Sequence, residues 1–179
     1  MAETEAGVSE YAKDILDTLE MNDEQRDMSG SILKLLENGG TLKDMNNLTD
    51  RDMEVIYSLG LNFYKSAKYD KARSMFQFLC FYDHTNPKWW NGLGATQQML
   101  KDYERAINAF AYATLLDVEN PQPQLQAGYC LMALQKYEEA VSALEGAIIT
   151  CGNDASFATF KTQAETLLAT AEAKAEEEE

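Results

Sequence analysis

The sequence predicts an all-α solenoid in which three helical hairpins of about 34 residues stack in a row. Glycine recurs at this interval, at Gly60, Gly94 and Gly128. Tyrosines, alanines and large apolar residues keep the same spacing: Tyr69, Tyr103, Tyr137, Ala72, Ala106, Ala140, Phe76, Phe110 and Leu144. The dipeptides Asn86-Pro87 and Asn120-Pro121 are also one interval apart. Three copies in one register indicate a true internal repeat.

The length of the period identifies the repeat as the tetratricopeptide type, a helix–turn–helix unit of 34 residues. The second copy has the signature of this type, with Trp90-x2-Leu93-Gly94 followed by Ala106-x3-Phe110. Such repeats stack into a curved solenoid whose inner surface binds extended peptides. The period alone therefore predicts a binding protein.

Each repeat is expected to contain two helices. Within residues 49–152, the repeats cover about 53–86, 87–120 and 121–152. The helices are predicted over residues 50–66, 69–83, 87–100, 103–117, 121–134 and 137–150. Pro87 and Pro121 suit a first helical turn, where the missing N–H leaves no hydrogen bond unmade. Thr49, with Asp52 three residues later, resembles a capping box for the first helix.

The mid-helix glycines predict close packing within each hairpin. Glycine inside a helix costs about 1 kcal/mol relative to alanine, so it is tolerated where it lets another helix approach closely. We expect Ala72, Ala106 and Ala140 to supply the matching small face of the second helix. The repeated tyrosines start that helix and are expected to wedge against the first.

The solenoid is expected to be flanked by additional helices. Residues 1–8 are predicted to be disordered, and residues 9–48 to form an N-terminal helical region that starts after Ser9 and ends in a short turn at Thr41. One stripe in this region has helical spacing and no place in a repeat: Met28, Ile32, Leu35 and Leu36. Residues 153–174 form a predicted capping helix with Asp154 or Ser156 at its start, and residues 175–179 an acidic tail.

The composition excludes several classes of partner. With 15 basic and 30 acidic residues the net charge is −15, which argues against nucleic acid and anionic membranes as direct ligands. Cys80, Cys130 and Cys151 form no C-x-x-C pair, which indicates reduced thiols. The acidic N-terminus is no signal peptide, and no apolar run could span a membrane, so a cytoplasmic protein is expected.

Catalysis and cofactor binding are not expected. His84 is the only histidine and has no cysteine in metal-ligand spacing. Gly92 and Gly94 lie within a predicted helix and follow no strand, so they do not form a phosphate loop. We predict neither an enzyme, nor a metal site, nor a cofactor.

The predicted binding site is the concave face, to which the first helix of each repeat contributes its second, fifth, ninth and twelfth positions. These are Glu54, Tyr57, Leu61, Tyr64, Lys88, Asn91, Ala95, Gln98, Gln122, Leu125, Tyr129 and Met132. Most are aromatic, aliphatic or amide side chains, which suit an extended hydrophobic peptide. Packing beneath the N-terminal helices is the structural alternative for some of them. The lysine–asparagine clamp with which other repeat proteins hold a terminal carboxylate is missing.

Three segments make the sequence resemble a known family, the class II chaperones of bacterial type III secretion, which hold the pore-forming translocator proteins. These segments are residues 39–44, 56–59 and 76–84 (GGTLKD, IYSL and FQFLCFYDH). The resemblance runs from about Gly39 to the end of the third repeat, whereas residues 1 to about 25 look longer than is usual in the family.

The resemblance implies a chaperone of the bacterial cytoplasm that keeps hydrophobic translocators soluble and apart before export, a virulence function. It implies that an extended N-terminal segment of the client, containing proline and leucine, binds residues at matching positions: Tyr57, Leu61, Tyr64, Tyr69 and Tyr82. It also implies a homodimer formed through the N-terminal region, with the stripe at Met28, Ile32, Leu35 and Leu36 as the interface, and a transcriptional regulator protein as a further partner.

A competing function from another class stays open at this point. A tetratricopeptide-repeat scaffold or adaptor would join folded partners through its convex face, including in a co-activator role. An unfolded hydrophobic segment used as bait against a folded partner would discriminate between the two.

Overall fold

The computed structural model describes residues 40–178 and divides the chain into two compact units, residues 1–49 and 50–179. The predictions for residues 1–39, including the start at Ser9 and the stripe from Met28 to Leu36, lie outside the described residues. In the first unit, helix α3 (Leu42–Met45) begins with a capping box. The backbone N–H and the hydroxyl of Thr41 both donate to Asp44 Oδ2 at 2.9 Å, and these bonds hold the pKa of Asp44 below its usual value.

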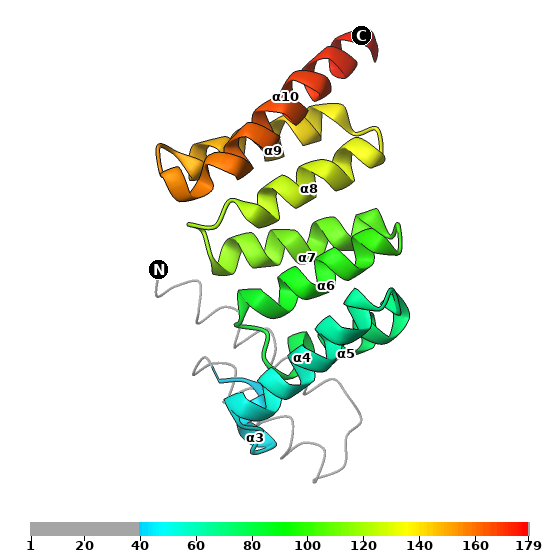
Figure 1. Cartoon of the computed structure of the whole chain (residues 1–179), viewed down its shortest axis with the longest axis vertical. Coiled ribbons are helices and arrows are strands. Elements are labelled where there is room, and N and C mark those ends of the chain that lie inside the picture. The colour runs from blue at the N-terminus through cyan, green and yellow to red at the C-terminus, as the bar shows by residue number, and fades with distance from the viewer. Residues whose placement is uncertain (1–39, 179) are drawn as a thin grey trace, which may run out of the picture. The chain divides into compact units, whose positions relative to one another are not determined.

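The second unit consists of helices, which confirms the predicted all-α repeat fold (Figure 1). Its elements are α4 (Asp50–Lys65), α5 (Tyr69–Tyr82), α6 (Pro87–Met99), α7 (Tyr103–Leu116), α8 (Gln122–Ala133), α9 (Tyr137–Cys151), a 3-10 turn (Ala155–Phe157) and α10 (Ala158–Glu178). The ends of α4 to α9 lie within one residue of the sequence predictions. Asn86 and Asn120 stand before α6 and α8, and each side-chain oxygen accepts a backbone N–H two residues on, at 3.0 Å.

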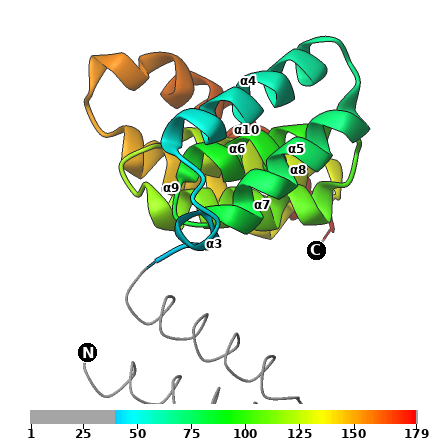
Figure 2. The ribbon, with the colours of Figure 1, turned by 90° about the horizontal axis from the view of Figure 1, so that it is seen from below.

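The helices form three hairpins that we divide into A helices (α4, α6, α8) and B helices (α5, α7, α9). Each A helix packs on its own B helix, and each B helix packs on the next A helix. Figure 2 looks along the stack. Neighbouring A helices also contact one another, whereas no two B helices in the described part of the chain approach as closely. The A helices therefore line the inner, concave face of this unit and the B helices its outer, convex face.

The glycines allow the close approach that the sequence predicts, but the partner is not alanine. A Cβ added to Gly60, Gly94 or Gly128 would lie 3.1, 2.7 or 2.6 Å from the side chain of the repeated large residue of the B helix. Those residues are Phe76, Phe110 and Leu144. The repeated alanines Ala72, Ala106 and Ala140 have no exposed surface and fill the helix interface beside them. The 34-residue period of the glycines therefore reflects the packing of a large B-helix side chain against the backbone of a glycine in the A helix.

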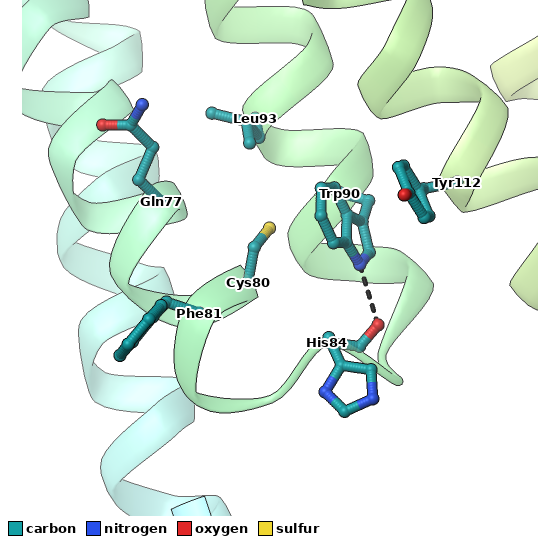
Figure 3. Close-up of a pocket in the computed structure, with 7 residues that line it drawn as sticks. All are labelled: Gln77, Cys80, Phe81, His84, Trp90, Leu93 and Tyr112. Carbon is teal, nitrogen blue, oxygen red and sulfur yellow. Dashed lines mark hydrogen bonds between the residues drawn. The ribbon is translucent and has the colours of Figure 1, made fainter. Parts of the chain in front are cut away.

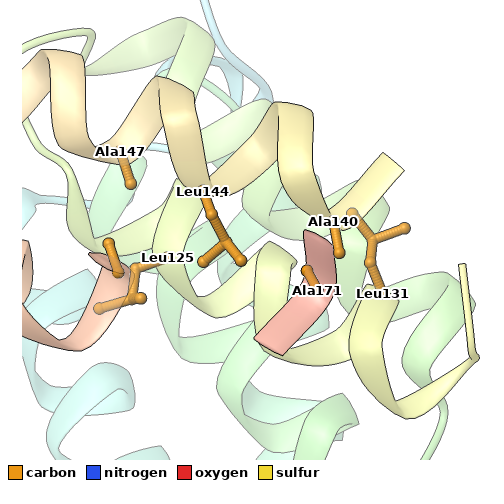
Figure 4. Close-up of a cluster of buried hydrophobic side chains, with 7 residues drawn as sticks. Leu125, Leu131, Ala140, Leu144, Ala147 and Ala171 are labelled. Carbon is orange, nitrogen blue, oxygen red and sulfur yellow. The ribbon is translucent and has the colours of Figure 1, made fainter. Parts of the chain in front are cut away.

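Helix α10 closes the C-terminal end of the solenoid. It packs on α9 and on α8, which is the place that the A helix of another repeat would occupy. Ala164 and Ala171 of α10 join a buried cluster with residues of α8 and α9, namely Leu125, Leu131, Ala140, Leu144 and Ala147 (Figure 4). Asp154 caps the preceding 3-10 turn by accepting the N–H of Ser156 at 2.8 Å. The helix continues to Glu178, past the predicted end at residue 174, since alanine and glutamate are strong helix formers.

Candidate peptide-binding groove

The A helices present equivalent repeat positions side by side on the concave face. Lys88 of α6 lies exactly one repeat after Glu54 of α4, and its Nζ is 2.7 and 2.9 Å from the two carboxylate oxygens. The same ammonium group lies 4.2 Å from the centre of the Tyr57 ring. This ion pair neutralises the one basic side chain among the predicted face positions, and it connects the first two repeats.

Tyr57 is held among aromatic rings at the boundary between the first two repeats. Its ring centre lies 5.7 Å from that of Phe76, edge-on, and 5.2 Å from that of Trp89. Burial raises the pKa of the Tyr57 hydroxyl, and the charge of Lys88 opposes this shift. The half-buried ring therefore offers a fixed apolar surface together with a neutral hydroxyl group, a combination that suits recognition of a peptide.

A second aromatic pair stands at the other end of α4. The rings of Tyr64 and Tyr69 meet edge-on at 5.6 Å, as expected if Tyr69 wedges against the first helix of its repeat. Burial raises the pKa of Tyr64, and the neighbouring Tyr69 contributes in the same direction. Leu61 lies between Tyr57 and Tyr64 on α4 and is partly exposed. Two of the four predicted face residues in the first repeat, Tyr57 and Tyr64, are thus aromatic.

The second and third repeats supply amide and aliphatic groups. Asn91, Ala95, Gln98 and Met132 are partly exposed, and Tyr129 is 36% exposed. Gln98 makes a hydrogen bond to Cys130, which partly offsets the effect of burial that raises the pKa of this thiol to about 11. Asn91 Oδ1 is buried and accepts no hydrogen bond in the structure. In the second repeat, Asn91 and Gln98 are thus polar at the two positions where the first repeat has Tyr57 and Tyr64, whereas the third repeat has Leu125 and Met132 there.

Two of the predicted peptide-binding residues differ from this pattern. Leu125 has no exposed surface and belongs to the core that α10 covers, so its assignment to the groove is wrong in this structure. An apolar side chain at an A-helix position can face either solvent or the neighbouring helix, and here the core takes it. Tyr82 ends a B helix, and its ring contacts Phe78 at 4.3 Å and Phe81 at 5.3 Å. Its place in the groove stays a prediction.

The sequence reasoning missed two contributors to this site. Trp89 is 2% exposed, and its indole N–H donates to Asp83 Oδ2 at 3.1 Å, which fixes the ring that backs Tyr57. Lys88 is among the predicted face residues, but its spacing in the sequence does not predict its position over the Tyr57 ring. Opposite charges one repeat apart, at Glu54 and Lys88, were the available signal for this pair.

Within residues 40–178 the structure shows no group of three or more histidine, cysteine or acidic side chains that could hold a metal ion. Cys80, Cys130 and Cys151 are buried and unbridged, and burial raises the pKa of Cys80 to about 12. No helix in this part of the chain is long and apolar enough to cross a membrane.

Comparisons with known proteins agree with this arrangement. A sequence family described as tetratricopeptide repeat matches residues 53–86 and 87–120. Low calcium response locus protein H of Yersinia pestis is 40% identical over 65 residues, which are 36% of this chain and 39% of that protein. The match thus spans well under half of that relative's length.

Solved structures are similar over much more of the chain. A type III secretion complex from Aeromonas hydrophila includes a chain that is 31% identical, with a TM-score of 0.79, covering 82% of this chain and 98% of that one. The type III secretion chaperone SycD of Yersinia enterocolitica, crystallised with a peptide of the translocator YopD, is 31% identical, with a TM-score of 0.68. That match covers 71% of this chain and 97% of SycD.

Proposed function

Since this chain belongs to the class II translocator chaperones of type III secretion, we propose that its concave groove binds an extended, hydrophobic segment of a translocator protein. The bound segment is withdrawn from water, so that the client stays soluble and separate from other translocators until export. The observation that carries this proposal is the aromatic wall around Tyr57, to which two repeats contribute. A relative of the same fold was crystallised with a translocator peptide.

The chemistry of the groove defines the kind of segment it accepts. Glu54 neutralises Lys88, so a terminal carboxylate finds no free cation at that position. The tyrosine rings and Leu61 accept proline and leucine side chains, while Asn91 and Gln98 offer amide groups to the peptide backbone. Burying about 400 Å² of apolar peptide surface at about 25 cal/mol per Å² gives about 10 kcal/mol before the cost of ordering the peptide. Micromolar or tighter binding follows, and release remains feasible.

Substitution of the aromatic wall tests the groove. Tyr57→Ala combined with Tyr64→Ala is expected to weaken binding of a labelled, proline- and leucine-containing translocator peptide at least tenfold in fluorescence anisotropy. The thermal melt should shift by only a few degrees, because both side chains are partly exposed. Tyr112→Ala, on the outer face, is the matched control and should leave the affinity unchanged. An unaltered affinity in the double variant would refute the groove.

Self-association through the N-terminal region is part of the same proposal. The helix that the sequence predicts for the stripe at Met28, Ile32, Leu35 and Leu36 would have to bury its apolar face, and a two-fold dimer lets the patch meet itself. The high net charge opposes association, so salt should strengthen the dimer. Sedimentation of the wild type is expected to show a dimer at tens of micromolar, and Ile32→Asp with Leu36→Asp a monomer. A dimer that survives both substitutions excludes this interface.

The cellular setting follows from the family. We place the protein in the bacterial cytoplasm, where its clients are made, and we propose that any role in transcription passes through a regulator protein. With a net charge of −15, direct contact with DNA is disfavoured.

A further inference from the structure

The outer face carries a row of large apolar side chains that the groove does not use. Phe81, Leu115 and Ile149 occupy the same position in three successive repeats, one on each B helix, and are 65%, 75% and 78% exposed. Single exposed apolar residues are common on protein surfaces. Three of them at one repeat position instead recur at a regular interval along the solenoid, and we call them the outer row. Exposed apolar side chains that gather on one face of a protein mark interaction sites.

A preformed trough adjoins the outer row, between α5, α6 and α7. It consists of two pockets of about 530 and 170 Å³, which share the lining residues Trp90, Leu93 and Tyr112. Figure 3 shows the residues that line the larger pocket. Trp90 donates its indole N–H to the carbonyl oxygen of His84 at 2.8 Å and stacks on Tyr112, with ring centres 4.6 Å apart. These contacts fix both rings, so the trough exists before any partner arrives.

An unpaired polar atom in the wall of the trough indicates a ligand. Gln97 of α6 lines the smaller pocket and is 4% exposed, and its Oε1 accepts no hydrogen bond in the structure. Buried carbonyl oxygens nearly always have a donor, because leaving one unpaired is destabilising. A partner that brings an N–H or O–H group into the smaller pocket would donate the missing hydrogen bond to Gln97 Oε1.

The charges around the trough define the chemistry of the partner. Arg105 is the one charged residue that lines either pocket, and it forms an ion pair with Asp102 at 3.2 Å. The outer row ends on α9, which exposes Glu138, Glu139 and Glu145. Lys136, just before this helix, lies 3.9 Å from Glu139 and 3.3 Å from Glu104, so the surface stays acidic mainly through Glu138 and Glu145. A complementary ligand is therefore apolar over the trough and basic towards α9.

We propose that the outer row and the trough together dock the apolar face of a basic amphipathic helix from a second protein. One face of such a helix is a straight apolar stripe, which matches the linear row, and its flanking lysines or arginines meet the acidic surface of α9. The site is formed by the B helices together with Trp90, Leu93 and Gln97 of α6, whereas the predicted groove uses other positions of the A helices, so both ligands are expected to bind at the same time. This site does not depend on the identity of the groove client.

The test uses a fluorescein-labelled amphipathic helical peptide of leucine and lysine and the full-length chain. Phe81→Asp combined with Leu115→Asp is expected to weaken its binding at least tenfold in fluorescence anisotropy. Thr162→Asp combined with Thr166→Asp is the matched control, since both threonines are exposed on α10 and the added charge is identical. A peptide held only by its positive charge would bind both variants as tightly as the wild type or more tightly. That result, or an equal loss in the control, overturns the proposal.

Competition separates this site from the groove. An unlabelled groove peptide in excess should leave the helical peptide bound, and displacement would place the helix in the groove and refute the outer site. The groove peptide should bind the Phe81→Asp, Leu115→Asp variant as it binds the wild type, so failure of the groove is recognised independently. Leu115→Asn repeats the test without adding charge and is expected to weaken the helical peptide several-fold. Full binding by this variant would also count against the site.

Discussion

The two helices pack together in the same way in the first repeat and in the third, but the two repeats present different surfaces to a ligand. In both, a glycine of the A helix seats a large side chain of the B helix, Gly60 with Phe76 and Gly128 with Leu144. At the fifth A-helix position, however, Tyr57 lies half-buried among rings while Leu125 is fully buried in the core under α10. The repeat period constrains the residues that pack the two helices of each hairpin together. It does not constrain the residue types at the groove positions. In the proposed groove, each repeat would therefore contact a different part of an extended client.

The largest effects on stability should come from removing the large B-helix side chains that pack against these glycines. Phe76→Ala and Leu144→Ala each empty a site with no exposed surface, and we expect losses of about 3–5 and 2–5 kcal/mol of unfolding free energy. Phe76 also supports the ring of Tyr57, so only its loss should weaken groove-peptide binding by the folded protein. Urea denaturation and peptide titration measure the two effects. Equal affinities in both variants would show that the rings of the first repeat do not determine binding.

A smaller effect tests the packing against glycine within the third repeat. A Cβ at Gly128 would lie 2.6 Å from Leu144, so Gly128→Ala should destabilise the protein by about 1–3 kcal/mol through overpacking. A Cβ at Gly146 meets only the flexible end of Gln124, at 3.3 Å. Gly146→Ala should therefore stabilise α9 by up to about 1 kcal/mol through helix propensity. If the two variants melt alike, close approach is not the reason for the repeated glycine.

The smallest effect concerns the turns between the paired helices, which are alike in the two repeats. Ala67 and Gln135 stand at the same repeat position with φ of 55° and 61°, in the left-handed region that side chains with a Cβ avoid. Ala67→Gly and Gln135→Gly should each raise the unfolding free energy by about 0.5–1 kcal/mol, after the entropy of glycine is counted. Similar gains in thermal melts would support equivalent turns, and a loss in either variant would contradict this explanation.

The architecture could be predicted from the sequence because each repeat carries its own signals for helix starts and helix packing. A helix start marked by Asn-Pro and a glycine at a fixed interval place six helices to within one residue. The sequence predicts less well whether a side chain at a groove position is buried or exposed. Leu125 stands at the same repeat position as Tyr57, but it is buried in a cluster to which α9 and α10 both contribute. Contacts between repeats, such as Lys88 over Tyr57, likewise depend on how neighbouring hairpins are rotated, which the period does not encode.

Helix α10 also limits how large an assembly of this chain can grow. Bare solenoid ends can stack on one another head to tail, and a contact of that kind continues into an open filament because no rotation closes it. Here the last apolar surface of the third repeat is covered by α10, which turns threonine, glutamine and glutamate side chains to solvent along its length. The large apolar side chains of α10, Phe160, Leu167 and Leu168, are partly buried against the solenoid, so another molecule meets a mainly polar surface there. The C-terminal end of the solenoid thus disfavours open-ended stacking of this kind.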